Sequence, residues 1–397
     1  MTDTSPLLNL WQGFGVKPVQ GDWRLMQSHI HTILASNNAI HASYITRWLA
    51  WAVQNPSKRA EVMLILKSEE EGSGKGVLAN SMVEIFGMGI HGVRIDKPKQ
   101  LTGDFNAHLQ RASLVYVDEG HWPGNKADEG AYKGIITEPY FAVQPKGIDI
   151  YFVPNCSHII CTSNNDWVAP AGPTARRLAI FRVSPQRVGD RAYFKALFDQ
   201  MENGGREAML YDLLNMELGD WHPRNDIPQT EELMEQKLRS NDSELAWFID
   251  LLDAGRLPGS GNKYLSLNEC PAEWIFDAYT QHAGKTGKYH KSVQTMLGIK
   301  LRKWLKDCKP YLRNREGSYP RGEDGGTKRG TIYQFPPLDE CRKAIGKHLN
   351  GSIPWHGPEE WVPSMEEDEE YEEQQRAQRD ASYEEAKQRM GDEDMPF

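Results

Sequence analysis

Hydrophobic residues recur at helical spacing near the start of the chain and then give way to short, continuous apolar runs. The spacing over 43–54 predicts an amphipathic helix that ends at Asn55-Pro56. The apolar positions of this helix are Ile45, Trp48, Leu49, Ala52 and Val53. The run Val62–Leu66 is apolar throughout, as expected for a strand buried on both faces. A glycine-bearing loop follows, and a helix is predicted over 75–86.

Two more apolar runs, Leu114–Val117 and His158–Thr162, predict buried strands of the same kind. Because strands alternate with helical stretches, we expect an α/β fold with a parallel sheet. Between these two strands, alternation on either side of Lys146-Gly147 predicts a β-hairpin. Its alternating residues are Phe141, Val143, Ile148, Ile150 and Phe152. A further apolar stretch is Leu178–Phe181, and 184–256 is predicted to be mostly helical.

The remainder of the chain has a different organisation. Leu257–Lys263 is typical of a linker, and amphipathic helices are predicted over 269–283 and 291–308. The second helix is expected to bury Val293, Met296, Leu297, Leu301, Trp304 and Leu305 and to expose Lys300, Lys303 and Lys306. A turn-rich stretch then separates possible strands near Tyr311 and Ile332-Tyr333. Two helices followed by a hairpin indicate a small winged-helix-like domain.

Four segments follow from these patterns. They are a helical N-terminal segment (1–56), an α/β domain with a helical lid (57–256), a basic winged-helix-like domain (264–350) and an acidic tail (357–397). We expect the tail to be disordered, because its composition is low in complexity and strongly charged.

The formal net charge of −9 is distributed unevenly along the 397 residues. Residues 357–397 carry 15 acidic and 4 basic side chains, so the rest of the chain has a net charge of +2. Lys285–Lys347 carries 16 basic and 6 acidic residues. This distribution indicates contact with polyanions and an arm that is repelled by them. A solvated surface with a solubilising tail is the alternative.

Several classes of protein are excluded by composition. No apolar run approaches the length of about 18 residues that a membrane-spanning helix needs. The N-terminus lacks the features of a signal peptide. The five cysteines include no C-x-x-C pair, so neither a disulfide framework nor a zinc knuckle is indicated. We expect a protein of the cytoplasm, with no membrane partner.

A phosphate-binding loop is indicated between the first buried strand and the helix after it. Its residues are Gly72, Ser73, Gly74, Lys75 and Gly76. Glycines let backbone amides approach phosphates, the helix N-terminus adds partial positive charge, and Lys75 would contact the β- and γ-phosphates. The full pattern G-x-x-x-x-G-K-[ST] requires glycine at 69 and a hydroxyl at 76, where this chain has Glu69 and Gly76. A plain glycine turn is the alternative.

Polar residues follow each of the next apolar strands. Asp118 could hold Mg²⁺ and Glu119 could polarise an attacking water. Asn164 could orient that water, and Arg176 or Arg177 could stabilise charge on a transferred phosphoryl group. Taken singly, Asp118 and Glu119 also fit a solvated acidic pair. Asn164 also fits a turn, and the two arginines fit a surface ion pair. As an ordered set, they favour a nucleotide-hydrolysing site.

The order of these motifs resembles that of superfamily 3 helicases, and more closely the helicase portion of phage and plasmid primase–helicases. The matching stretches are GSGKG, LVYVDE, the Lys-Gly hairpin, IICTSNN and ARRLAIFRV. The resemblance implies an AAA+-like P-loop ATPase core that uses ATP and Mg²⁺. It also implies a homo-oligomeric ring, usually a hexamer, around single-stranded DNA.

The resemblance also assigns roles to individual residues. Lys75 corresponds to the Walker A lysine, and Asp118 with Glu119 to the Walker B pair. Asn164 would be the sensor asparagine, and Arg176 or Arg177 the finger given to a neighbouring subunit. The remaining match, Lys146, would be the pore-loop residue that grips DNA.

Two further groups of residues are candidates for binding. Lys300, Lys303 and Lys306 share a predicted helix face and could contact DNA phosphates. The chain ends in Asp392, Glu393, Asp394, Met395, Pro396 and Phe397. This end resembles the acidic tip of bacterial single-stranded DNA-binding proteins, and a terminal phenylalanine with its carboxylate could dock on host replication proteins. An acidic tail that happens to end in phenylalanine is the alternative.

The sequence thus predicts an ATP-dependent, ring-forming DNA helicase of a phage or mobile element, active in DNA replication. The alternative is an interaction protein that binds nucleotide without hydrolysing it. Such a protein would recruit or sequester host replication factors through its acidic C-terminal tip.

Overall fold

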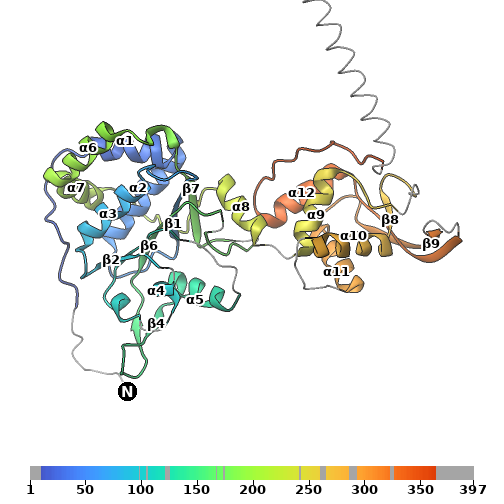
Figure 1. The fold of residues 1–397 in the computed structure, drawn as a ribbon, viewed down its shortest axis with the longest axis horizontal. Helices are drawn as coiled ribbons and strands as arrows, with labels where there is room; N and C mark the ends of the chain where they lie inside the picture. The colour runs from blue at the N-terminus through green and yellow to red at the C-terminus, as the bar shows by residue number, and fades with distance from the viewer. Residues whose placement is uncertain are drawn as a thin grey trace, which may run out of the picture. The chain divides into compact units, whose positions relative to one another are not determined.

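A computed structural model describes residues 10–97, 99–103, 106–120, 126–166, 168–172, 175–240, 243–259, 265–285, 293–321 and 326–363. The chain divides into two compact units, with the boundary between Ser240 and Asn241. The first unit is built on a parallel sheet, and the second combines helices with a small antiparallel sheet (Figure 1).

A five-stranded sheet in the order β2-β3-β6-β1-β7 forms the centre of the first unit. Its strands are β1 (Met63–Lys67), β2 (Gly92–Ile95), β3 (Leu114–Val117), β6 (His158–Ser163) and β7 (Leu178–Arg182). Every neighbouring pair in this sheet is parallel. The predicted α/β fold with a parallel sheet is therefore confirmed.

Helices cover both faces of this sheet (Figure 1). One face carries α1 (Arg24–His29), α2 (Ala39–Gln54), α3 (Lys75–Phe86), α6 (Arg191–Gln200) and α7 (Arg206–Asn215). The other face carries α4 (Lys99–Thr102), α5 (Lys126–Thr137) and α8 (Glu231–Arg239). Short π or 3-10 turns are η1 (Ile30–Leu34), η2 (Ala107–Leu109), η3 (Pro185–Arg187) and η4 (Met201–Gly205). Alternate residues of β1 accordingly enter two different cores, with Leu64 in one and Ile65 in the other.

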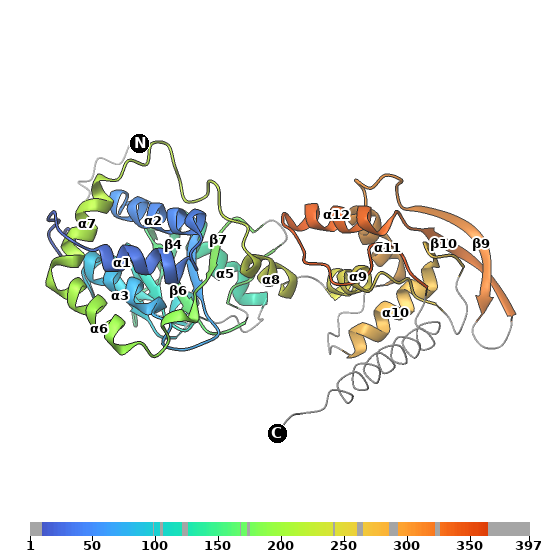
Figure 2. The same cartoon turned by 90° about the horizontal axis from the view of Figure 1, so that it is seen from above.

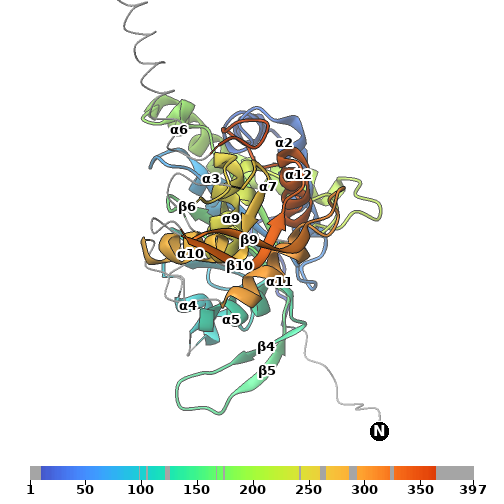
Figure 3. The ribbon, with the colours of Figure 1, turned by 90° about the vertical axis from the view of Figure 1, so that its right-hand side faces the viewer.

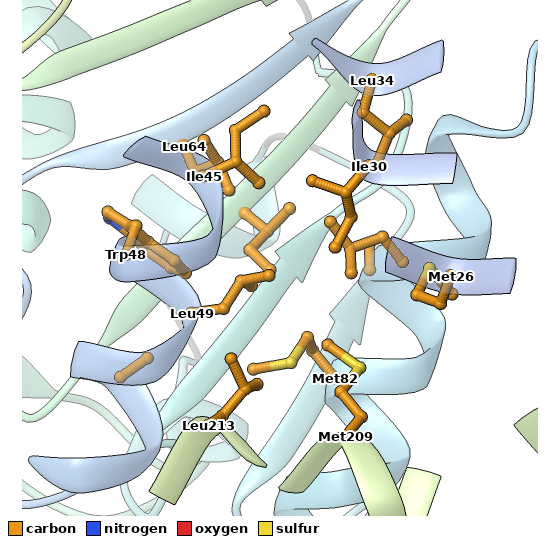
Figure 4. Close-up of a cluster of buried hydrophobic side chains, with 14 of the residues drawn as sticks. Met26, Ile30, Leu34, Ile45, Trp48, Leu49, Leu64, Met82, Met209 and Leu213 are labelled. Carbon is orange, nitrogen blue, oxygen red and sulfur yellow. The ribbon is translucent and has the colours of Figure 1, made fainter. Parts of the chain in front are cut away.

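The N-terminal helices are a layer of this unit. Figure 4 shows Trp48 and Leu49 of α2 beside Leu64, with Met82 of α3 and Leu213 of α7 in the same cluster. The Trp48 indole also donates a hydrogen bond of 3.0 Å to the carbonyl of Val62. Residues 24–54 thus complete the core around β1, where the sequence analysis had set 1–56 apart as a segment.

The predicted hairpin around Lys146-Gly147 is present as β4 (Tyr140–Val143) and β5 (Tyr151–Pro154). Figure 3 shows it extending away from the parallel sheet. Val143, at the end of β4 nearest the turn, is fully buried, whereas Ile148, Ile150 and Phe152 are 61%, 56% and 72% exposed. The hairpin therefore projects a largely apolar arm from the first unit.

Within its described residues, the second unit contains four helices and a three-stranded antiparallel sheet in the order β8-β10-β9. The elements are α9 (Ser243–Ala254), β8 (Glu269–Pro271), α10 (Ala272–Lys285), α11 (Gln294–Trp304), β9 (Arg313–Arg321), β10 (Gly326–Gln334) and α12 (Leu338–Leu349). Strands β9 and β10 form a hairpin that projects beyond the helices of this unit (Figure 2). Because α9 packs against α10 and α12, it lies in this unit and not with the residues before it.

The buried face of α11 differs from the prediction in part. Leu297, Leu301 and Trp304 are buried as expected, but Val293 and Met296 are 61% and 47% exposed. Val293 is the N-cap residue and precedes the first helical turn. Met296 lies one position before Leu297, which turns it by about 100° from the buried stripe.

The segment 357–363 is packed, in contrast to the disorder expected for a tail beginning at 357. Trp361 is buried against Phe335 and donates a hydrogen bond of 2.8 Å to the carbonyl of Pro336. Val362 donates to the carbonyl of Gly255 at 2.9 Å. A tryptophan supplies enough apolar area to hold this strap to the second unit despite the acids around it. Residues 364–397 lie outside the described part of the chain.

The cysteines and the lengths of the apolar helices bear on the protein classes considered from the sequence. All five cysteines are free thiols, and four of them are buried. Within the described residues, no helix is both long and apolar enough to cross a membrane.

The shared core gives a test of the N-terminal layer. Leu49→Ala should lower the free energy of unfolding by about 2–5 kcal/mol, because it removes a fully buried side chain between α2 and β1. Ile40→Ala on the same helix is the matched control, since Ile40 is 72% exposed and should change stability by less than about 0.5 kcal/mol. Urea denaturation of both variants measures this; equal effects would contradict the shared core.

Candidate functional site

The predicted site residues meet at the carboxyl edge of the parallel sheet. Strand β1 leads directly into the glycine loop, β3 ends before Asp118, and β6 ends before Asn164. Strand β6 lies between β3 and β1, and its Ser163 is level with Lys67. Three strand ends separated by long stretches of sequence therefore deliver polar side chains to one place.

Lys75 is held at this edge by two oxygen acceptors. Its Nζ donates to the hydroxyl of Ser68 at 2.8 Å and to the amide oxygen of Asn164. Ser68, which the sequence analysis missed, is the first residue after β1, and its hydroxyl donates a hydrogen bond to the carbonyl of Glu70. Burial lowers the pKa of Lys75, and the carboxylates of Asp118, Glu71 and Glu119 oppose that shift. The lysine is thus within electrostatic reach of the acidic pair.

The glycine loop is held in place by side chains from the helical layer. Gly74 caps α3 with a φ of 89°, and a Cβ at this position would lie 2.6 Å from the ring of Phe194. The carbonyl of Gly74 accepts a hydrogen bond of 3.1 Å from Nε2 of His29, whose Nδ1 accepts from the Tyr193 hydroxyl at 2.9 Å. A carbonyl can only accept, so Nε2 carries a proton, and burial lowers the pKa of His29, which leaves the imidazole neutral with Nδ1 as acceptor. Helices α1 and α6 thereby fix the start of α3.

Asp118 accepts several hydrogen bonds. Its Oδ1 accepts from the hydroxyls of Tyr116 and Thr162 at 2.7 and 2.9 Å. Its Oδ2 accepts from the guanidinium of Arg94 at 2.7 Å. The neighbouring Glu119 is exposed and has a φ of 51°, a strained conformation for a residue with a side chain. Both acids thus have a fixed backbone position at the end of β3.

The donor set fits Mg²⁺ that is bound together with nucleotide phosphates. Such a magnesium ion takes one or two protein carboxylates and completes its coordination with phosphate oxygens and water. Asp118, Glu71 and Glu119 are the carboxylates that act on Lys75, and the first and last of them stand together after β3. Among the described residues, no group of three or more His, Cys, Asp or Glu side chains could hold a metal by itself.

The acidic residues that precede the loop point into solvent. Glu69 has a side-chain exposure of 80% and lies 4.0 Å from Arg182, at the end of β7. Arg182 also pairs with Glu232 and Glu235 of α8. This cation offsets part of the negative charge beside the phosphate loop.

The two arginines predicted as a finger lie at the opposite edge of the sheet. Arg177 precedes β7, and its carbonyl accepts a hydrogen bond of 2.8 Å from the amide of Met63, where β1 begins. A strand of this length spans roughly 17 Å, which separates both arginines from the phosphate loop of the same chain. The Arg177 guanidinium donates to the Thr137 hydroxyl at 3.2 Å, whereas Arg176 is exposed.

The other candidate residues are dispersed. Lys146 is exposed at the tip of the β4–β5 hairpin. Lys300 forms an ion pair of 2.8 Å with the buried Glu244, so it is not the solvent-facing cation expected, while Lys303 and Lys306 are exposed. The predicted partner-binding residues 392–397 lie outside the described residues.

Comparison with known proteins supports the fold. Residues 66–177 match a family model described as a family of unknown function, DUF5906. No curated protein matches the sequence.

Among solved structures, the NrS-1 C-terminal region (residues 305–718) is similar at 15% identity and a TM-score of 0.58, covering 83% of this chain and 79% of that one. A second structure of that region, its A form, gives a TM-score of 0.57 over 83% and 78% of the two chains. JCV helicase, in complex with a small molecule, matches at a TM-score of only 0.33 and 11% identity, from which we draw nothing.

The His29 contact generates a prediction about pH. Burial lowers the pKa of His29 from 6.5 to about 4, so the folded state binds its proton less readily than the unfolded chain. This contribution to stability is complete above pH 6.5 and is lost as the pH falls towards 4, by about 3 kcal/mol in total.

His29→Gln removes this titration. The stability of the wild type relative to the variant should therefore be greater at pH 7 than at pH 4. Burial also lowers the pKa of His158 to about 4, but His158 is present in both proteins, so its contribution cancels from the difference in stability. Chemical denaturation across this pH range measures the difference, and parallel stability curves would show that His29 is not the titrating group.

Proposed function

We propose that this protein is an ATP-dependent DNA helicase that acts as a ring in the replication of a phage or mobile element. The observation that carries the proposal is the convergence of Lys75, Asp118 and Asn164 behind a glycine loop at one edge of a parallel sheet. Their order along the chain and their meeting in space are independent properties, and both fit a nucleotide-hydrolysing site.

Each residue has a role in this site. Backbone amides from Gly72 to Gly76 would surround the phosphates at the N-terminus of α3, and Lys75 would exchange its present acceptors for phosphate oxygens. Asp118 would hold Mg²⁺, which supplies neutralisation of charge on the phosphates. Glu119 would orient and polarise the attacking water, and Asn164 would stabilise its position.

Assembly into a ring is supported by the place of Arg176. An exposed arginine at the edge opposite to its own phosphate loop is suited to reach the loop of a neighbouring copy. We favour Arg176 over Arg177, because Arg177 already bonds to Thr137 of its own chain. The exposed apolar residues Ile148 and Phe152 also favour association.

Contact with single-stranded DNA would come from two places. A ring of β4–β5 hairpins would present Lys146 side chains to the phosphate backbone without reading bases. In the second unit, two helices followed by a strand pair have the order of a winged helix. Exposed cations there lie on and after α11 and along the β9–β10 hairpin, namely Lys303, Lys306, Arg313, Arg321 and Arg329.

A second candidate is a protein that binds nucleotide but does not hydrolyse it, and whose acidic tail recruits or sequesters host replication proteins. Two observations favour it: Gly76 has no hydroxyl for a metal, and Arg94 pairs with Asp118. The two candidates differ in one measurable property, since the first hydrolyses ATP and the second does not.

The chemistry is tested by ATP hydrolysis with Mg²⁺, with and without single-stranded DNA. Glu119→Gln should keep nucleotide affinity and lose about 100-fold or more in turnover, because it removes only the activation of water. Lys75→Ala should lose nucleotide binding as well. Wild-type turnover equal to that of Lys75→Ala would establish the second candidate in place of the helicase.

The position of Arg176 predicts complementation between subunits. Arg176→Ala and Lys75→Ala proteins should each be inactive, and mixing them should restore part of the DNA-stimulated hydrolysis. The reason is that a mixed ring contains interfaces with one intact loop and one intact finger. Arg24→Ala is the control and should be active by itself, because the Arg24 side chain is 83% exposed on α1 and pairs with Asp22. Absence of rescue at every mixing ratio would contradict a finger supplied across subunits.

A further inference from the structure

The missing hydroxyl at position 76 leaves a space that another side chain fills. A Cβ built on Gly76 would lie 3.2 Å from the hydroxyl oxygen of Tyr116, closer than most Cβ contacts. Tyr116 is 1% exposed and reaches this point from β3, two residues before Asp118. Glycine at 76 and tyrosine at 116 are therefore sterically matched.

The Tyr116 hydroxyl is also hydrogen-bonded to a residue of the candidate site. It donates to Oδ1 of Asp118 at 2.7 Å and lies 3.1 Å from the Thr162 hydroxyl, which donates to the same oxygen at 2.9 Å. Two hydroxyls from adjacent strands thus converge on the carboxylate oxygen that faces α3.

We propose that the Tyr116 hydroxyl replaces the missing P-loop hydroxyl and acts as the positioning group for the nucleotide-bound Mg²⁺ at Asp118. This inference rests on the proposed nucleotide site and explains how that site works with glycine at 76. In the usual P-loop the hydroxyl projects from the first turn of the helix. Here it projects from the sheet towards the same turn, and the glycine makes room for it.

Moving the hydroxyl from position 116 to position 76 tests this inference. Tyr116→Phe removes the hydroxyl and keeps the ring, whereas Tyr116→Phe with Gly76→Ser moves a hydroxyl to the usual P-loop position. The phenyl ring without its oxygen leaves room for the serine. The control is Tyr44→Phe, since Tyr44 is also buried, and its hydroxyl donates to the carbonyl of Pro223, away from the site.

The readout is binding of a fluorescent ATP analogue, titrated with Mg²⁺ and repeated in EDTA. Tyr116→Phe should need about tenfold more Mg²⁺ to reach half of the Mg²⁺-dependent gain in affinity, since Asp118 loses one hydrogen bond to a charged group. Its affinity in EDTA should equal that of the wild type. The double variant should recover most of the loss, and Tyr44→Phe should match the wild type.

Recovery in the double variant separates positioning of the metal from a general structural effect, which a second substitution would not repair. If Tyr116→Phe needs no more Mg²⁺ than the wild type, or if the double variant is no better than the single one, the inference is wrong and the nucleotide site stands. If the wild type binds the analogue neither with Mg²⁺ nor in EDTA, the proposed function itself fails.

Discussion

The site depends on the burial of both faces of the parallel sheet. Strand β1 is covered by one core through Leu64 and by another through Ile65, so the charged groups of the site lie where the strands of the sheet end. That constraint gathers the lysine, the acids and the asparagine at one edge, and leaves the arginines at the other. It also makes the N-terminal helices part of the site, since the layer that covers one face supplies His29 to the glycine loop.

The central strands of the fold were predictable because they are short, continuous and apolar, and because glycine or acidic residues end them. Strand β2 was missed, since Gly92–Ile95 contains Arg94 and has no apolar run. The face of α11 was predicted only in part, because the spacing of apolar residues allowed two overlapping stripes and tertiary packing selected one. Trp361 was overlooked within an acidic segment, although a buried tryptophan outweighs such composition.

The candidate site was predictable as far as its residues carry a motif. Lys75, Asp118 and Asn164 follow predicted strands, so a parallel sheet was sufficient to bring them together. Ser68, Tyr116 and His29 have no such signal, because their roles depend on contacts across the sheet or between layers. Lys300 shows the reverse case: its helix face suggested exposure, but the buried acid Glu244 lies on another helix that sequence spacing could not place beside it.

The ion pair between Arg94 and Asp118 affects how the proposed magnesium site would bind its metal. Arg94, on the neighbouring strand β2, pairs with Asp118 at 2.7 Å and so places a positive charge of this chain on the carboxylate. Magnesium bound at Asp118, as proposed, would exchange one positive charge for another, so its affinity would be the difference between two ion pairs.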